Sequence, residues 1–403
     1  MLWGKPLSKI TNIAISVLMV SVYFFSSSMY TPSFPDIQSG LQTSEALVQQ
    51  TLSLFFIALA CSQLICGPLS ERYGRKPIAM LSSFVFVIGS MTCLLADSIE
   101  VLLIGRIIQG LGVGGLYLLC RTILQDAFEK TELMGILAWY GIFFMSLPGL
   151  TLILGGYLTQ HFGWHSNFVF MACLSIATLL IIAFVKRETI RKKNPDAIKP
   201  KQILKDYALI ASNVTFLCYL TMMFSGTSCI LLFQVTGSFV AQHEFDLTAA
   251  DYGIGSMVLI VSSVASRFIW TQFLKHRISE NMTLIYGSLI QIVGCVVITL
   301  SLVLHSYLLM LIGFSVMAFG SAFLLAVAGV SALYLFPNHK GQVGAIYGAL
   351  QMVGAFGFTF CLSFVPATHQ VMVISSWILS LSTGIALIIM YRQQSKNLVL
   401  AES

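Results

Sequence analysis

Gly67-Pro-Leu-Ser-Glu-Arg-Tyr-Gly-Arg-Lys-Pro77 is a short polar loop between two long apolar stretches of the chain. Two glycines permit a tight turn and a close approach of helices, and the charged side chains can form a network whose partners change when helices slide. A loop of this kind between apolar segments indicates a membrane protein with moving helices. The candidate switch residues in the loop are Gly67, Glu71, Arg72, Gly74, Arg75 and Lys76.

The composition of the chain indicates that its solvent is lipid. Of the 403 residues, 57% are hydrophobic and 9% are charged, whereas about a quarter of the residues of a soluble domain are charged. In a bilayer every backbone donor and acceptor needs an internal partner, which leaves helices and closed barrels. The long unbroken apolar runs exclude the alternating pattern of a barrel. The sequence therefore predicts an all-α membrane protein.

Twelve apolar segments are long enough to cross a hydrocarbon core of about 30 Å, which takes about 20 residues of helix. The eighth is interrupted by Arg267, and the tenth is long enough to be tilted or broken. The predicted spans are 10–31, 47–68, 78–95, 101–121, 132–157, 166–185, 209–233, 252–274, 282–304, 307–336, 342–366 and 370–391.

The basic residues predict the orientation of these spans. Of the 22 lysines and arginines, all but Arg106 and Arg267 fall at the chain ends or in loops that share one side of the membrane. By the positive-inside rule that side is the cytoplasm, so we expect a multi-pass protein of the bacterial inner membrane with both termini cytoplasmic. Lys5 and Lys9 precede span 1 as in a signal peptide, but the span is long and lacks a cleavage site, which favours a retained anchor.

One long polar connection divides the spans into six and six. It reads KRETIRKKNPDAIKPKQILK over Lys186–Lys205. We interpret it as a solvated linker, with a lipid-binding or regulatory role as the alternative. The predicted organisation is an N-terminal six-helix half over 1–185, a basic cytoplasmic linker over 186–208 and a C-terminal six-helix half over 209–403.

The polar loop resembles the signature loop of the major facilitator superfamily, whose twelve transmembrane helices form two six-helix halves. The fifth position of that signature is usually Asp, and Glu71 stands there in this chain. The resemblance implies that Glu71 binds the start of a helix of the second half, near Gly341. It also implies that Arg72 reaches an acid at the end of span 4, either Asp126 or Glu129. The alternative is a loop that only obeys the positive-inside rule.

Span 4 carries a charge at Arg106, within the segment LLIGRIIQGLGVGG of Leu102–Gly115. A charge inside a span costs about 2.5–3.5 kcal/mol even on a lenient insertion scale, so the arginine is a functional candidate. The segment resembles the second motif of the superfamily, in which Arg is followed by Gln and Gly, here Gln109 and Gly110. The resemblance implies an arginine that faces the cavity and serves proton transfer or substrate binding. Snorkelling to the outer interface is the alternative.

Span 5 contains Pro148-Gly-Leu-Thr-Leu-Ile-Leu-Gly-Gly156, in which the proline loosens the helix and Gly155 and Gly156 admit a neighbouring backbone. The stretch resembles the antiporter motif in the PxxxPxxGG form of the Bcr/CflA drug-resistance transporters. Leu152 replaces the second proline, and Thr151 stands where many antiporters have glycine. Further resemblance to that family lies in Arg121–Phe128, His161–Trp164 and Gly341–Gln351.

Span 1 departs from that family at one position. Ser28-Met-Tyr-Thr-Pro-Ser-Phe-Pro35 matches the family's Asp-Met-Tyr-Leu-Pro-Ala-Leu-Pro, with Ser28 in place of the carboxylate. A proton-coupled antiporter needs a buried acid that gains and loses a proton. Every acid of this chain falls in a loop or at a span end, and Asp36 is the nearest on span 1. Coupling therefore runs through span-end acids such as Asp126, or the transporter uses another driving force.

Polar and aromatic side chains remain as candidates for recognition inside the cavity. Apolar pockets with a few polar groups suit amphipathic ligands, and methionine adapts to varied shapes. With two arginines as the charges inside spans, a neutral or anionic substrate is favoured. For any single candidate, packing between helices is the alternative. The candidates for substrate or coupling are Arg106, Gln109, Tyr23, Ser27, Tyr30, Tyr117, Tyr140, Tyr219, Gln234, Tyr347 and Gln351, with Met222 and Met223 beside them.

The sequence favours a membrane transporter that moves small amphipathic drugs or metabolites by alternating access, most simply as efflux. The alternative is a transporter of a siderophore or another metabolite that works inward and without protons. An enzyme would need HExxH, paired aspartates or a serine with a base inside the spans, and none is present. The nine cysteines stand singly, so no cofactor and no metal are expected. The expected partners are a small-molecule substrate, protons as the candidate coupling ion and the bilayer, without nucleic acid, around a monomer.

Overall fold

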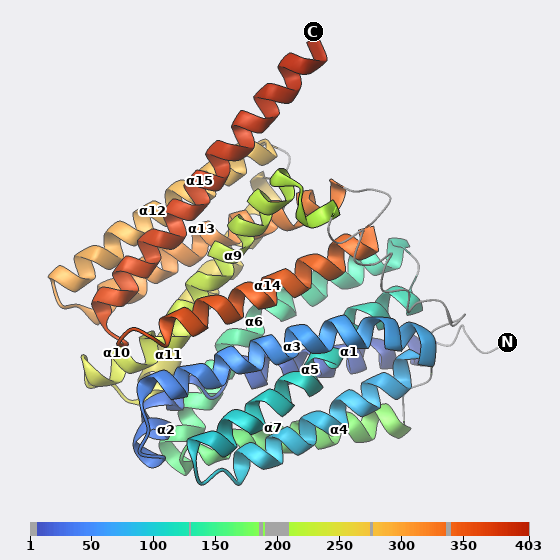
Figure 1. Ribbon diagram of the computed structural model, residues 1–403, viewed down its shortest axis with the longest axis vertical. Coiled ribbons are helices and arrows are strands. Elements are labelled where there is room, and N and C mark those ends of the chain that lie inside the picture. Colours follow the sequence, from blue (N-terminus) through green and yellow to red (C-terminus); the bar gives the residue numbers. More distant parts are fainter. Residues whose placement is uncertain are drawn as a thin grey trace. The chain divides into compact units, whose positions relative to one another are not determined.

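The computed structural model describes residues 6–128, 130–184, 188–189, 209–274, 277–335 and 340–402. Within these ranges the regular structure is helical, without strands. The chain begins with α1 (Pro6–Ser28), a 3-10 turn η1 (Thr31–Ser33) and the short α2 (Phe34–Gly40). Then follow α3 (Glu45–Tyr73), α4 (Arg75–Leu94), α5 (Ile99–Ala127), α6 (Lys130–Phe162) and α7 (His165–Phe184) (Figure 1).

The later part of the chain repeats this plan of long helices. Its elements are α9 (Val214–Val235), the short α10 (Gly237–His243), α11 (Ala249–Ile269) with a π-helical end η2 (Trp270–Leu274), α12 (Glu280–Val303), α13 (Tyr307–Tyr334), α14 (Lys340–Leu362) and α15 (His369–Glu402). Each of the twelve predicted spans overlaps a long helix, so the predicted twelve-helix fold is confirmed. The short helices α2 and α10 were not predicted.

Short polar side chains begin several of these helices. Asn213 Oδ1 accepts a hydrogen bond from the backbone N–H of Phe216 at 2.9 Å at the start of α9. Ser44, Ser98 and Ser279 accept the equivalent bond at the starts of α3, α5 and α12. Each cap satisfies a backbone donor that the first helical turn leaves open. The boundaries of the spans are therefore encoded locally.

The outer surfaces of the helices are apolar. Ile374, Ile378 and Ile385 of α15 are each more than half exposed, and similar side chains stay exposed on the other long helices. Among the described residues, ten helices are long and apolar enough to cross a membrane. Lipid is the medium in which such surfaces are solvated while the helices satisfy their own backbone groups.

Two compact units make up the structure. The first comprises Met1–Lys199 with Thr248–Ile254 and Thr359–Phe364, and the second comprises Pro200–Leu247, Gly255–Phe358 and Val365–Ser403. The predicted linker over 186–208 lies outside the described residues except for 188–189, so the predicted domain boundaries stay a prediction.

Each unit contains a tightly packed helix pair with a glutamine at its centre. In the first unit a methyl group on Gly89 of α4 would meet the backbone nitrogen of Gln109 on α5. In the second unit a methyl group on Gly320 of α13 would meet the backbone nitrogen of Gln291 on α12. These pairs show a repeat between the two parts of the chain that is faint in the sequence.

Candidate functional site

Arg106 of α5 is completely buried in the first unit. Its guanidinium lies 4.2 Å from the ring centroid of Tyr30 and 4.3 Å from that of Phe55 on α3, so two aromatic rings hold the cation. Nη1 donates a hydrogen bond to Oε1 of Gln109 at 2.6 Å. Nε2 of Gln109 in turn donates to Oγ of Ser90 on α4 at 2.9 Å. The structure therefore joins three of the predicted site residues, Tyr30, Arg106 and Gln109.

The charge of Arg106 has no buried carboxylate to balance it among the described residues. Its Nε and Nη2 are buried without a hydrogen-bond partner, and no described Asp or Glu is buried. A buried ion without a counter-ion is costly, and the ring faces and Gln109 offset only part of that cost. The N–H groups of these two nitrogens can bind an anion or a hydrogen-bond acceptor. Snorkelling does not describe this side chain, because none of it reaches the surface.

A break after the first helix positions Tyr30. The residue lies between α1 and η1, and its hydroxyl shares a hydrogen bond with Oγ1 of Thr51 on α3 at 2.9 Å. Gly155 of α6 lies so close to the break that a methyl group on it would overlap the carbonyl oxygen of Met29. Gly155 thus permits the close approach of α6 that holds Tyr30 beside Arg106.

The rest of the span 5 motif packs within the same unit. A methyl group on Gly156 would overlap the carbonyl oxygen of Ala249 at the start of α11. Pro148 lies inside α6, and its carbonyl accepts a hydrogen bond from Oγ1 of Thr151 at 2.8 Å. Leu152, in place of the second proline, is buried. The motif therefore serves close helix packing at its glycines.

Two further candidates of the first unit form an aromatic cluster. The rings of Tyr23 on α1 and Tyr117 on α5 lie 4.3 Å apart between centroids, and Phe144 of α6 lies 6.4 Å from Tyr117. The guanidinium of Arg121 lies 5.5 Å from the ring of Tyr117 and 5.4 Å from that of Phe144. Sequence reasoning did not select Arg121, although it begins the RTILQDAF segment. The side chain of Tyr140 lies outside the described residues.

Ser27 and Ser28 end α1 in buried positions. Oγ of Ser27 donates to the carbonyl of Phe24 at 3.3 Å, and the carbonyl of Ser28 accepts from Oγ1 of Thr31 at 2.9 Å. Asp36, the nearest acid on this segment, is exposed. Within the described residues the structure therefore supplies no buried carboxylate near Ser28.

The candidate residues of the second unit do not all lie together. Tyr219 belongs to a core cluster with Met222 and Met223, and Tyr347 packs against the same cluster. Gln234 is buried near the end of α9, about 22 Å along the helix axis from Tyr219 at 1.5 Å per residue. Tyr219 and Tyr347 are thus brought together, and Gln234 is not. Gln351 is half-buried on α14.

Sequence reasoning missed one polar group in this unit. Nε2 of Gln291 on α12 donates to Oγ of Ser321 on α13 at 2.9 Å, and its Oε1 is buried without a hydrogen-bond partner. The feature of the sequence that could have identified this group is a glutamine in the middle of the predicted span 282–304. The group is an open acceptor that a donor on a ligand could use.

The polar loop forms an ion pair that differs from the predicted one. Nε of Arg75 lies 3.0 Å from Oδ2 of Asp126 at the end of α5, whereas Arg72 is exposed and lies over the ring of Tyr73 at 5.4 Å. The expected pair of Arg72 with Asp126 is therefore wrong. Gly74 has a φ of 115°, which ends α3 and starts α4 with Arg75 turned inward. Arg72 stays on the last turn of α3.

The described contacts do not test the other predictions for the polar loop. Glu71 is exposed, and the surroundings of Gly341 and the position of Glu129 lie outside the described residues. The contact of Glu71 with the second half stays a prediction. Gly67 packs near Leu118 of α5.

Glu188 binds the start of α4. Its carboxylate oxygens accept hydrogen bonds from the backbone N–H of Arg75 at 2.9 Å and of Lys76 at 3.1 Å, where the helix dipole favours a negative charge. A methyl group on Gly74 would overlap Oε2 of this carboxylate. Nζ of Lys76 also donates to the carbonyl of Ala183 at 2.8 Å. Sequence reasoning missed Glu188, although it is the first acid after span 6.

Comparisons with known proteins support the same family. The Major Facilitator Superfamily profile matches residues 17–359. The chain is 24% identical to Multidrug resistance protein D of Escherichia coli (strain K12) over 363 residues, which is 88% of this chain and 89% of that protein. It is 26% identical to the Bicyclomycin resistance protein homolog of Haemophilus influenzae over 82% of this chain and 83% of that protein.

Solved structures of transporters share the fold. A crystal structure of a D-xylose-proton symporter superposes with a TM-score of 0.75 at 14% identity, covering 95% of this chain and 97% of the symporter. The POT family transporter PepTSo superposes with a TM-score of 0.73 at 12% identity, covering 98% of both chains. The twelve helices, the buried arginine of span 4 and the family match together make the protein a transporter and not an enzyme, and the chain belongs to the major facilitator superfamily.

Proposed function

We propose that this transporter exports small amphipathic compounds across the bacterial inner membrane by alternating access, and that Arg106 binds a neutral acceptor or an anionic group of the substrate. The basic residues support an orientation with both termini in the cytoplasm. The names of the relatives support efflux, since several are multidrug resistance proteins. We propose a monomer as the working unit.

The observation that carries the proposal is the unbalanced charge of Arg106. Two of its nitrogens have no hydrogen-bond partner although they are buried, so a ligand that supplies an oxygen there gains a charge-assisted hydrogen bond. The rings of Tyr30 and Phe55 cover the cation and are themselves buried, so under this proposal a ligand reaches the guanidinium when the surrounding helices open during alternating access. A cationic ligand would meet repulsion from the same guanidinium.

Ser28 supports a second candidate, transport of a metabolite without proton coupling and in the inward direction. A serine cannot carry a proton between the two sides of the membrane, and no described acid is buried. Under this alternative the substrate gradient alone drives the cycle. Under the first proposal, acids at span ends such as Asp126 carry the proton.

Flux in sealed inside-out vesicles tests both candidates. The probes are fluorescein as an anion, a neutral coumarin and ethidium as a cation, each with and without an imposed pH gradient. We expect uptake of fluorescein or coumarin above that of vesicles without the protein. Uptake of ethidium alone, or of no probe, would contradict the proposed substrate class. Flux that persists after an ionophore collapses the gradient would favour the alternative over proton-coupled efflux.

A further inference from the structure

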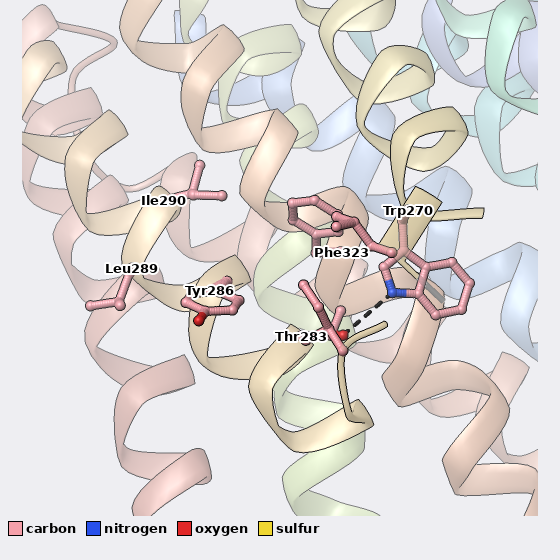
Figure 2. Close-up of a pocket in the computed structure, with 8 residues that line it drawn as sticks. Trp270, Thr283, Tyr286, Leu289, Ile290 and Phe323 are labelled. Atoms are coloured by element: carbon pink, nitrogen blue, oxygen red, sulfur yellow. Dashed lines mark hydrogen bonds between the residues drawn. The ribbon is translucent and has the colours of Figure 1, made fainter. Parts of the chain in front are cut away.

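A pocket of about 260 Å³ lies on the outside of the second unit, between α12, α13 and the π-helical end of α11 (Figure 2). It is distant in the sequence from Arg106 and contains none of the predicted site residues. Its lining is almost entirely apolar. The lining residues are Trp270, Leu274, Ile278, Thr283, Tyr286, Leu289, Ile290 and Phe323.

The wall of the pocket depends on a distorted helix. Trp270–Leu274 is π-helical, whereas the preceding Ala249–Ile269 is α-helical. Single turns of π-helix are rare and occur frequently at functional sites. Nε1 of Trp270 donates to Oγ1 of Thr283 at 3.4 Å, the dashed contact in Figure 2. This bond satisfies the indole N–H and leaves the ring as an apolar wall.

Lipid is the medium on the open side of the pocket. Tyr286 is 47% exposed and Leu289 is 52% exposed, and both belong to α12, one of the helices long and apolar enough to cross a membrane. From Thr283 to Ile290 the helix rises about 10 Å at 1.5 Å per residue. An acyl chain can therefore lie along α12 from the end of the helix toward the middle of the bilayer.

A basic turn forms the rim of the pocket. The carbonyl of Leu274 accepts hydrogen bonds from the backbone N–H of Arg277 at 2.9 Å and of Ile278 at 3.0 Å. Leu274 and Ile278 both line the pocket, so the turn between them brings the exposed Arg277 to its edge. The nearby Glu280 accepts a hydrogen bond from Oγ of Ser331 at 2.9 Å.

We propose that this pocket binds one acyl chain of an anionic phospholipid whose headgroup is held by Arg277. Cations at a membrane surface attract anionic lipids, and Trp and Tyr side chains favour the interface. The pocket contacts the acyl chain, and Arg277 supplies the positive charge for the headgroup. In the proposed orientation this lipid comes from the cytoplasmic leaflet. The site is separate from substrate binding and provides a means by which lipid composition acts on the second unit.

Native mass spectrometry of the purified full chain tests the site with phosphatidylglycerol and phosphatidylcholine of identical acyl chains. We expect one phosphatidylglycerol molecule to be retained, with a preference of about five-fold over phosphatidylcholine. Arg277→Gln should abolish the preference while lipid still binds. Leu289→Trp, which places a larger side chain in the pocket, should reduce retention of both lipids.

Two matched variants control this experiment. Arg392→Gln removes an exposed arginine of α15 that does not line the pocket, and Leu300→Trp enlarges an exposed leucine of α12 that does not line it. Both should bind lipid as the unaltered chain does. Equal retention of the two lipids by the unaltered chain would overturn the proposal. Losses in Arg392→Gln and Leu300→Trp equal to those in Arg277→Gln and Leu289→Trp would also overturn it. Thermal melts of all four variants identify any that have failed to fold.

Discussion

Arg75 and Asp126 form an ion pair across the ends of α4 and α5, with Nε and Oδ2 3.0 Å apart. Nη1 of the same arginine donates to Oγ of Ser70 on α3 at 2.6 Å, so one guanidinium joins the ends of three helices. Glu188 binds the first N–H groups of α4 beside it. The polar loop is therefore held by a compact set of polar contacts in the first unit.

Arg75→Gln and Asp126→Asn should each lower the free energy of unfolding by about 1 kcal/mol, because the pair is only partly exposed to solvent. The double variant should lose less than the sum of the two single losses, since the same interaction is removed in both. Thermal melts in detergent measure the effect. Arg72→Gln is the control and should melt like the unaltered chain. Additive losses would show that the pair contributes nothing by itself.

Glu188→Gln should destabilise the start of α4 by about 0.5–2 kcal/mol, because a neutral amide interacts less well with the helix dipole and its N–H groups. Hydrogen exchange at the first turn of α4 reports the loss locally, and the exchange rate should rise there. Glu71→Gln, a change at an exposed acid near the end of α3, serves as the comparison. An unchanged exchange rate in Glu188→Gln would refute the capping role.

Gly155→Val should lower stability by about 1–3 kcal/mol and reduce transport, because the new side chain overlaps the carbonyl of Met29. The displaced backbone would carry Tyr30 away from Arg106. Melting temperature and vesicle flux measure the two consequences. Gly384→Ala is the control, since no atom lies within 4 Å of the added methyl group. If both variants behave alike, the close approach at Gly155 is unimportant.

Arg106→Ala should reach the membrane and fold, and the apparent affinity for fluorescein or coumarin should fall by about 10- to 100-fold, the value of a charge-assisted hydrogen bond. Arg106→Lys keeps the charge but loses the planar stacking on Tyr30 and Phe55, so an intermediate affinity is expected. Concentration dependence of vesicle flux gives the affinities. Normal affinity in Arg106→Ala would leave the residue with a purely structural role.

Ser28→Asp should make flux respond to the pH gradient more strongly, because the new carboxyl group would lie in a buried position that can exchange a proton. Flux at several imposed gradients provides the measurement. Ser27→Asp places the same group one residue earlier, also buried, and should not create this response. A response of equal size in both variants would argue against a special role for position 28.

The sequence alone determined the class of the protein and the number of its spans. Low charge content and long apolar runs leave a helix bundle as the one structure that satisfies the backbone in lipid, and short polar caps set where helices begin. Arg106 was selected as a candidate because a charge inside a span is too costly to lack a role, and Gln109 was selected because its segment resembles the second motif of the superfamily. The motif around Gly74 identified the family.

The tertiary structure decided which of these residues meet. Arg72 and Arg75 are equivalent in charge, and only the left-handed turn at Gly74 selects Arg75 as the partner of Asp126. Glu188 could not be chosen, because its partners are backbone groups more than 100 residues away in the sequence. The pocket beside Arg277 likewise arises from a π-helical turn that apolar patterning does not encode. Composition and periodicity act locally, whereas these contacts depend on how distant helices pack.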